Sequence, residues 1–244
     1  DFCRLLGIKA TDTGISDLIS LLKAIPPGHP LENLIRDAPD FVQDGSLADS
    51  LLNPCDRAYS VPQLFDFINK ADLKFVRWIR QAPYSPYCGV ISKFPQIKEF
   101  AKLSPEEQFT AVELFRGTMV RHSIIAYRDE NSAGTEPVNF DNDNGKWTNF
   151  IPIRVPETIC ITDRLPEGAA AVLINRTHAY RDLILTIDPS EKQLYDAIDG
   201  FSNIGEIMEK IRNVPDSKSS LEISRNFFKR LWWYDQVVFD TSKS

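Results

Sequence analysis

Three helix-start signals of the same kind divide this 244-residue chain into helical and strand-like stretches. Residues 60–63, 104–107 and 188–191 each begin with serine or aspartate, continue with a proline, and end with glutamine or glutamate three positions after the first residue. The first side chain caps the helix, proline fits the first turn because it needs no N–H there, and the last side chain reaches back to the cap. We therefore expect helices after residues 60, 104 and 188.

Strand-like sequence fills the interval between the second and third signals. Residues 121–187 are rich in β-branched side chains, which favour strands. An earlier run at 73–80 has the same character, although basic residues interrupt its alternation. We predict further strands over 122–127, 150–155, 158–161, 170–175 and 183–187, the last two joined through 176–182 as a hairpin.

Helical periodicity occupies both ends of the chain. Near the start, Ser16 is a candidate cap for a helix that residues 26–30 stop, and short helices are expected over 31–37 and 46–52. After residue 188 we expect helices over 192–198, 203–212 and 219–234 and a final strand over 236–240. The predicted fold class is α+β, with domains at 1–128 (mainly helical, with a short hairpin) and 146–244 (strand-rich, then helical), joined by a flexible linker loop over 129–145.

Composition and charge indicate which classes of partner and which cellular compartment to expect. Hydrophobic residues make up 43% of the chain, which suits a globular protein with a real core. Residues 1–128 hold 15 basic and 15 acidic residues, so the net charge of −6 comes entirely from the remainder, with 13 and 19. Such a surface disfavours nucleic acid and anionic membranes. Since neither a secretory leader nor an apolar run of about 18 residues is visible, we expect a cytoplasmic protein with reduced, mostly buried cysteines.

Two phrases, residues 53–66 and 80–89, resemble the region that follows the cofactor domain in certain bacterial class I S-adenosylmethionine-dependent methyltransferases. The resemblance implies a carboxyl-terminal regulatory or accessory part with a terminal winged-helix-like module, cut from a longer protein that starts before Asp1. It also implies that residues 59–91 form a helix, a strand, a turn and a second short strand, like the last hairpin of a methyltransferase sheet. An independent α+β domain is the alternative.

The same resemblance implies that cofactor chemistry lies outside this chain. The eleven glycines include no G-x-G pair, and no glycine-rich turn between a strand and a helix is visible. We therefore expect no cofactor or metal here, S-adenosylmethionine in the missing catalytic domain, and no catalytic residue in this part. The expected partners are the amino-terminal methyltransferase domain of the parent chain and, beyond it, a protein substrate.

Candidate interface residues combine guanidinium groups and phenols around the predicted hairpin. Such side chains are over-represented at protein interfaces because they bury a large area and still form hydrogen bonds. A solvated sheet face is the alternative interpretation. The set comprises Arg57, Tyr59, Arg77, Arg80, Tyr84 and Tyr87.

Two histidines complete the set of candidate site residues. His122 and His178 both lie in strand-rich sequence near arginine, and with Asp182 they could form an acid–base or metal site. The sequence does not fix their separation, and a structural role is favoured.

Basic residues also follow one side of the last predicted helix. Arg225, Lys229 and Arg230 could face phosphates, but the four aromatic residues among them favour a protein contact or a core.

Three hypotheses about function result. The first is a non-catalytic accessory part of a methyltransferase that recognises substrate or regulates the catalytic domain. The second is a stand-alone winged-helix module that binds protein or, less favourably, DNA. The third is an enzyme built around His122 and His178.

Overall fold

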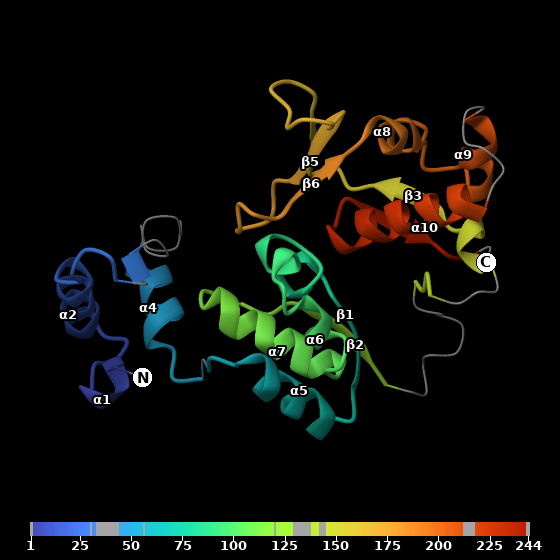
Figure 1. Ribbon diagram of the computed structural model, residues 1–244. Helices are drawn as coiled ribbons and strands as arrows, with labels where there is room; N and C mark the ends of the chain where they lie inside the picture. Colours follow the sequence, from blue (N-terminus) through green and yellow to red (C-terminus); the bar gives the residue numbers. More distant parts are fainter. Residues whose placement is uncertain are drawn as a thin grey trace. The chain divides into compact units, whose positions relative to one another are not determined.

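The structure, a computed structural model, describes residues 2–29, 31–32, 44–55, 57–119, 121–128, 138–141, 145–211 and 218–242. It is a mixed α+β fold with small antiparallel sheets, which confirms the predicted class (Figure 1). The chain divides into two compact units, Asp1–Tyr59 and Ser60–Ser244. Within the described ranges, no helix has the length and apolar character that crossing a bilayer requires.

The first unit is helical, with α1 (Phe2–Leu5), α2 (Asp12–Lys23) and α4 (Asp44–Leu52) around a small core of Leu18, Leu47 and Leu52. The predicted start of α2 at Ser16 is wrong. Thr11 is the cap, because its hydroxyl accepts from the amide of Gly14, whereas the hydroxyl of Ser16 donates to a carbonyl within the helix. The predicted helix over 31–37 lies largely outside the described residues.

The first part of the second unit contains a two-stranded sheet with helices before and between its strands. Both predicted capping boxes, at Ser60 and Ser104, are confirmed. β1 and β2 pair antiparallel, with Trp78 opposite Ile124. The elements are α5 (Val61–Lys70), β1 (Lys74–Trp78), α6 (Ile97–Phe100), α7 (Pro105–Arg116) and β2 (Ile124–Tyr127).

The hairpin predicted within residues 59–91 is wrong. Residues 82–84 and 90–93 form short 3₁₀ helices, and the partner of β1 is β2. Pro83 and Pro86 have no N–H to give to a sheet, and Gly89 adopts a positive φ of 73°, so this segment turns instead of extending.

The described residues of the rest of the second unit form two further small sheets and the helices α8, α9 and α10, whose bounds follow. β3 pairs antiparallel with β7, while β4, β5 and β6 form a three-stranded antiparallel sheet that confirms the predicted hairpin over 176–182. Asp188 caps its helix as predicted. The elements are β3 (Ile151–Arg154), β4 (Thr158–Ile161), β5 (Ala171–Asn175), β6 (Ile184–Ile187), α8 (Pro189–Asp196), α9 (Ile204–Lys210), α10 (Lys218–Trp233) and β7 (Val237–Asp240).

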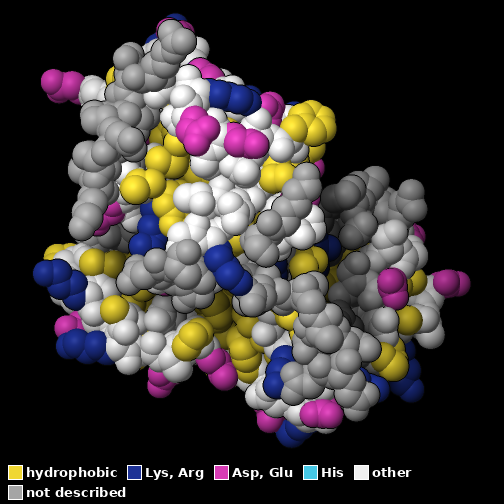
Figure 2. All heavy atoms as spheres, turned by 90° about the vertical axis from the view of Figure 1, so that its right-hand side faces the viewer, with side chains coloured by type: hydrophobic (Ala, Val, Ile, Leu, Met, Phe, Trp, Pro, Cys, Tyr) yellow, Lys and Arg dark blue, Asp and Glu magenta, His cyan; other side chains and the backbone are white. Residues whose placement is uncertain are grey.

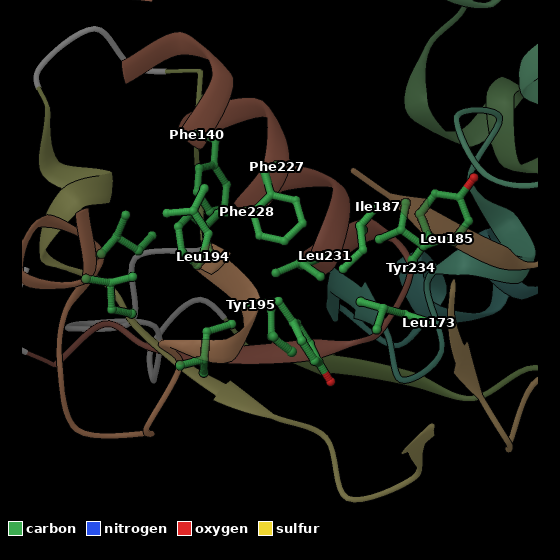
Figure 3. Close-up of a cluster of buried hydrophobic side chains, with 14 of the residues drawn as sticks. Phe140, Leu173, Leu185, Ile187, Leu194, Tyr195, Phe227, Phe228, Leu231 and Tyr234 are labelled. Carbon is green, nitrogen blue, oxygen red and sulfur yellow. The ribbon is translucent and has the colours of Figure 1, made fainter. Parts of the chain in front are cut away.

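One side of α10 forms the centre of the largest core. Phe227, Phe228 and Leu231 of this helix are each 0% exposed. They lie among aliphatic residues of β5 and β6 and two residues of α8 (Figure 3). Ala82 and Cys88, from the segment after β1, belong to the same core.

That core contains residues from both sides of the predicted domain boundary at 129–145. The loop over 129–145, expected to separate two domains, lies inside the second compact unit. Residues before and after it bury side chains together and share hydrogen bonds, so the contacts that define a unit cross the loop. Residues 129–137 and 142–144 lie outside the described part.

Candidate functional site

The predicted site residues fall in both compact units. Arg57 and Tyr59 belong to the first, where the guanidinium of Arg57 lies 5.1 Å from the centre of the Tyr59 ring. The other six, Arg77, Arg80, Tyr84, Tyr87, His122 and His178, belong to the second.

Tyr84, His122 and Glu113 form a largely buried polar network. The Tyr84 hydroxyl lies 2.7 Å from Nδ1 of His122, and Nε2 of His122 lies 3.3 Å from Oε1 of Glu113. The other carboxylate oxygen of Glu113 accepts from the amide of Val61. Burial raises the pKa of the Tyr84 phenol above its ordinary value, and its ring stacks on Trp78 at 3.7 Å. Tyr84 is only 5% exposed, so these contacts among Tyr84, His122 and Glu113 support the packing of α5, α7 and β1.

His178 belongs to a second network, centred on Asp235. The carboxylate of Asp235 accepts from the amides of Gln81 and Ala82 at 3.0 and 2.9 Å, and lies 3.1 Å from Nε2 of His178. Its carbonyl accepts from the side chain of Asn175. Asp235 is 5% exposed and has a φ of +52°, in the left-handed region. The two histidines therefore hydrogen-bond in separate networks, and their side chains are only 7% and 2% exposed.

Asp182 joins neither histidine in these networks. It accepts from the amide of Val90 at 2.9 Å and forms an ion pair with Arg116 at 3.2 Å. Arg116 also donates to the carbonyl of Pro83 and lies 4.2 Å from the ring centre of Tyr180. The acid–base arrangement considered from the sequence is replaced by a structural tie between α7 and the loop before β6.

Segment 80–90, which contains the second resembling sequence, thus connects β1 with the end of α10 and with the loop before β6. We call this segment the junction of the second unit. Besides the ties to Asp235 and Asp182, the amide of Gly89 donates to the Tyr234 hydroxyl at 3.0 Å. The Cys88 thiol lies against the carbonyl of Trp233, and burial raises its pKa, which makes it a packed side chain and a poor nucleophile. The prediction of mostly buried cysteines is wrong for Cys55 and Cys160, which are exposed.

Replacing Gly89 with alanine tests this junction. An added Cβ would lie 2.1 Å from Oδ2 of Asp182, at a φ that side chains rarely adopt. We expect the free energy of unfolding, measured by urea titration, to fall by about 3 kcal/mol. Gly200→Ala is the matched control, because its φ is +81° but no atom lies within 4 Å of the added Cβ; we expect a loss of about 1 kcal/mol there. Equal losses would show that the contact with Asp182 does not matter.

Arg77 and Tyr87 both contact the end of α10. The guanidinium of Arg77 lies 4.0 Å from the ring centre of Trp232, and the ring of Tyr87 stacks on Trp233 at 4.7 Å. Burial lowers the pKa of Arg77, against the opposite effect of the Asp235 carboxylate. Arg80 is partly buried. Sequence reasoning missed Asp235 and Arg116, since nothing near them in the chain indicates their distant partners.

Two open hollows border α10. The larger, about 880 Å³, mixes acidic, basic and apolar walls: Asp141, Gly145, Trp147, Thr148, Leu221, Glu222, Arg225, Asn226 and Lys229. The smaller, about 240 Å³, is lined by Val138, Asn139, Phe140, Asp141, Lys229, Trp232 and Trp233. Apolar side chains gather in patches between basic and acidic ones on one face of the molecule (Figure 2).

The basic residues predicted along α10 each have a partner within the chain. Arg225 donates to the carbonyl of Phe140, Lys229 pairs with Asp141, and Arg230 pairs with Glu191. These contacts within the chain favour the core interpretation of this helix over a phosphate-binding one.

No model of a known protein family matches this chain. In the described part of the chain, no group of three or more His, Cys, Asp or Glu residues is arranged to hold a metal ion.

Proposed function

We propose that this chain is the non-catalytic accessory region of a cytoplasmic S-adenosylmethionine-dependent methyltransferase, where it recognises a protein substrate or regulates the catalytic domain. The observation that carries the proposal is the role of residues 80–90. The segment donates backbone hydrogen bonds to Asp235, Asp182 and Tyr234. The close packing that these bonds require explains why prolines, a glycine and a small buried thiol occur there. The segment that carries the second resemblance is therefore part of the packed framework of the protein, where it forms 3₁₀ turns and not the implied hairpin.

The end of the chain supports a finer assignment within this proposal. Helices α8, α9 and α10 follow one another and lead into β7, which pairs with β3 from before the helices. This order of elements suits the winged-helix-like module expected from the resemblance. The hollows along α10 lie on this module and offer it a binding surface.

The size and activity of the native polypeptide test the proposal. An antibody raised against this 27.7 kDa chain should detect, in the source cells, a polypeptide longer by a domain of roughly 100–200 residues. The polypeptide captured by that antibody should transfer labelled methyl groups from S-adenosylmethionine to protein, and antibody pre-absorbed with the pure chain is the control. A native polypeptide of 27.7 kDa would instead favour the stand-alone interaction module.

A further inference from the structure

We propose that the smaller hollow beside α10 is a pocket for a methylated lysine side chain on a peptide, and that Lys229, one of its lining residues, contacts the binding groups Trp233 and Asp141 in the free protein. The ammonium pocket is defined by Asp141, Trp232 and Trp233, with Asn139 at its edge. Its volume and walls carry this inference independently of the methyltransferase proposal.

The position of Lys229 shows what the pocket recognises. Its ammonium nitrogen lies 4.8 Å from the ring centre of Trp233 and forms an ion pair with Asp141. An aromatic face and a carboxylate around one cationic nitrogen are the groups that bind substituted ammonium ions. The protein therefore already holds an ammonium group of its own at this place.

Packing fixes the walls of the pocket before any ligand arrives. Phe140 is 2% exposed, belongs to the same core as Phe228 (both labelled in Figure 3) and lies with its ring 5.3 Å from that of Phe239, and its carbonyl accepts from Arg225. On the other wall, Arg77 covers Trp232. Tyr87 stacks on Trp233 with an angle of 17° between the rings. Packing therefore fixes the aromatic walls before binding, which lowers the cost of ordering them.

A methylated ammonium suits this pocket better than the resident lysine does. With Lys229 in place as a lining residue, an open volume of about 240 Å³ remains beside its ammonium group. Methyl groups fill such a space against indole rings, and they reduce the hydration that must be lost on burial. The side chain of Lys229 is 21% exposed, and its flexible stem allows the ammonium to move into solvent.

The neighbouring hollow points to a peptide as the carrier of this group. Asp141 and Lys229 line both hollows, so the two meet at these side chains. The larger hollow continues past Arg225 and Glu222, whose opposite charges suit the polar backbone and side chains of an extended segment. A peptide would lie along α10 with its methylated lysine in the ammonium pocket.

The inference is tested by titrating the whole chain with a peptide that carries trimethyl-lysine. Tryptophan fluorescence, measured at constant ionic strength, reports the binding. We expect saturable binding that becomes about fivefold tighter in Lys229→Met, because the internal competitor is removed. Binding should weaken at least about tenfold in Asp141→Asn and in Trp233→Leu, which lose the carboxylate and the aromatic face. The unmethylated peptide should bind more weakly than the trimethylated one.

Matched controls make the result decisive. Lys192 forms a comparable ion pair with Asp196 on α8, so Lys192→Met should leave the affinity unchanged. Choline should compete with the peptide, and its neutral analogue 3,3-dimethylbutan-1-ol should not. Asp141 is 74% exposed, so Asp141→Asn is expected to fold even if Trp233→Leu does not.

Three outcomes would overturn the inference. They are the absence of saturable binding in both wild type and Lys229→Met, equal competition by the neutral alcohol, and binding to phosphatidylcholine vesicles without binding to the peptide. Peptide binding by a polypeptide that transfers no methyl group would support this pocket and contradict the proposed function, so the two can fail separately.

Discussion

Replacing Asp235 with alanine is expected to lower the free energy of unfolding of the second unit by about 3–5 kcal/mol. The carboxylate accepts from two backbone amides, those of Gln81 and Ala82, and lies beside Nε2 of His178. Alanine would leave these donors buried and without an acceptor, at a position whose φ of +52° also disfavours a plain side chain. Urea unfolding followed by far-ultraviolet circular dichroism measures the loss.

Two further variants separate the causes of that loss. Asn tolerates the left-handed conformation and keeps one acceptor oxygen, so Asp235→Asn should cost roughly half as much. Asp163 has a side chain that is 91% exposed and pairs with an equally exposed arginine, so Asp163→Ala should change stability by less than about 0.5 kcal/mol. If Asp235→Ala changed stability as little as Asp163→Ala, the junction would not depend on this carboxylate.

The helix starts could be predicted from the sequence because capping is a local interaction. Ser60, Ser104 and Asp188 each exchange hydrogen bonds with a residue three positions later, so the whole signal lies in one short phrase. Where two nearby residues could both cap the same helix, the local sequence did not identify the residue at which the helix begins. Thr11 and Ser16 both have suitable hydroxyls, and only the backbone conformation around Thr11 decides between them.

The partner of β1 could not be predicted because strand pairing joins distant residues. The sequence after β1 offered a nearby turn, and the resemblance added a hairpin, but β2 lies beyond α7 in the chain. The junction is still less local, since Gln81 and Asp235 are 154 positions apart. Nothing in a short window of sequence indicates that a carboxylate at the end of the last helix receives those amides.

The internal contacts of the candidate site residues could not be predicted for the same reason. From their residue types, Arg77, Tyr84 and Tyr87 were expected to lie at an interface with a partner. The sequence could not tell that their contacts lie within the protein. Tyr84 bonds to His122, and Arg77 and Tyr87 cover the two tryptophans of α10. Arg77 and Tyr87 thereby help to fix the positions of Trp232 and Trp233.

Replacing Phe227 with alanine is expected to cost about 3–5 kcal/mol, the range for a large aromatic side chain removed from a core. Phe227 is 0% exposed and lies 5.5 Å from the ring centre of Phe228. Phe201→Ala is the matched control, because Phe201 is 84% exposed and should contribute less than about 0.5 kcal/mol. Urea unfolding again measures both variants.

The same variant tests whether the second unit unfolds as one body. The core around Phe227 includes Ala82 and Cys88, so a cavity there should weaken the junction as well as the packing of α10. Two probes report on the two sides, namely circular dichroism for the helices and labelling of the Cys88 thiol, which is 0% exposed until the junction opens. Their midpoints should shift together in Phe227→Ala. A shift in circular dichroism without a shift in thiol labelling would mean that the junction opens independently of the core beneath α10.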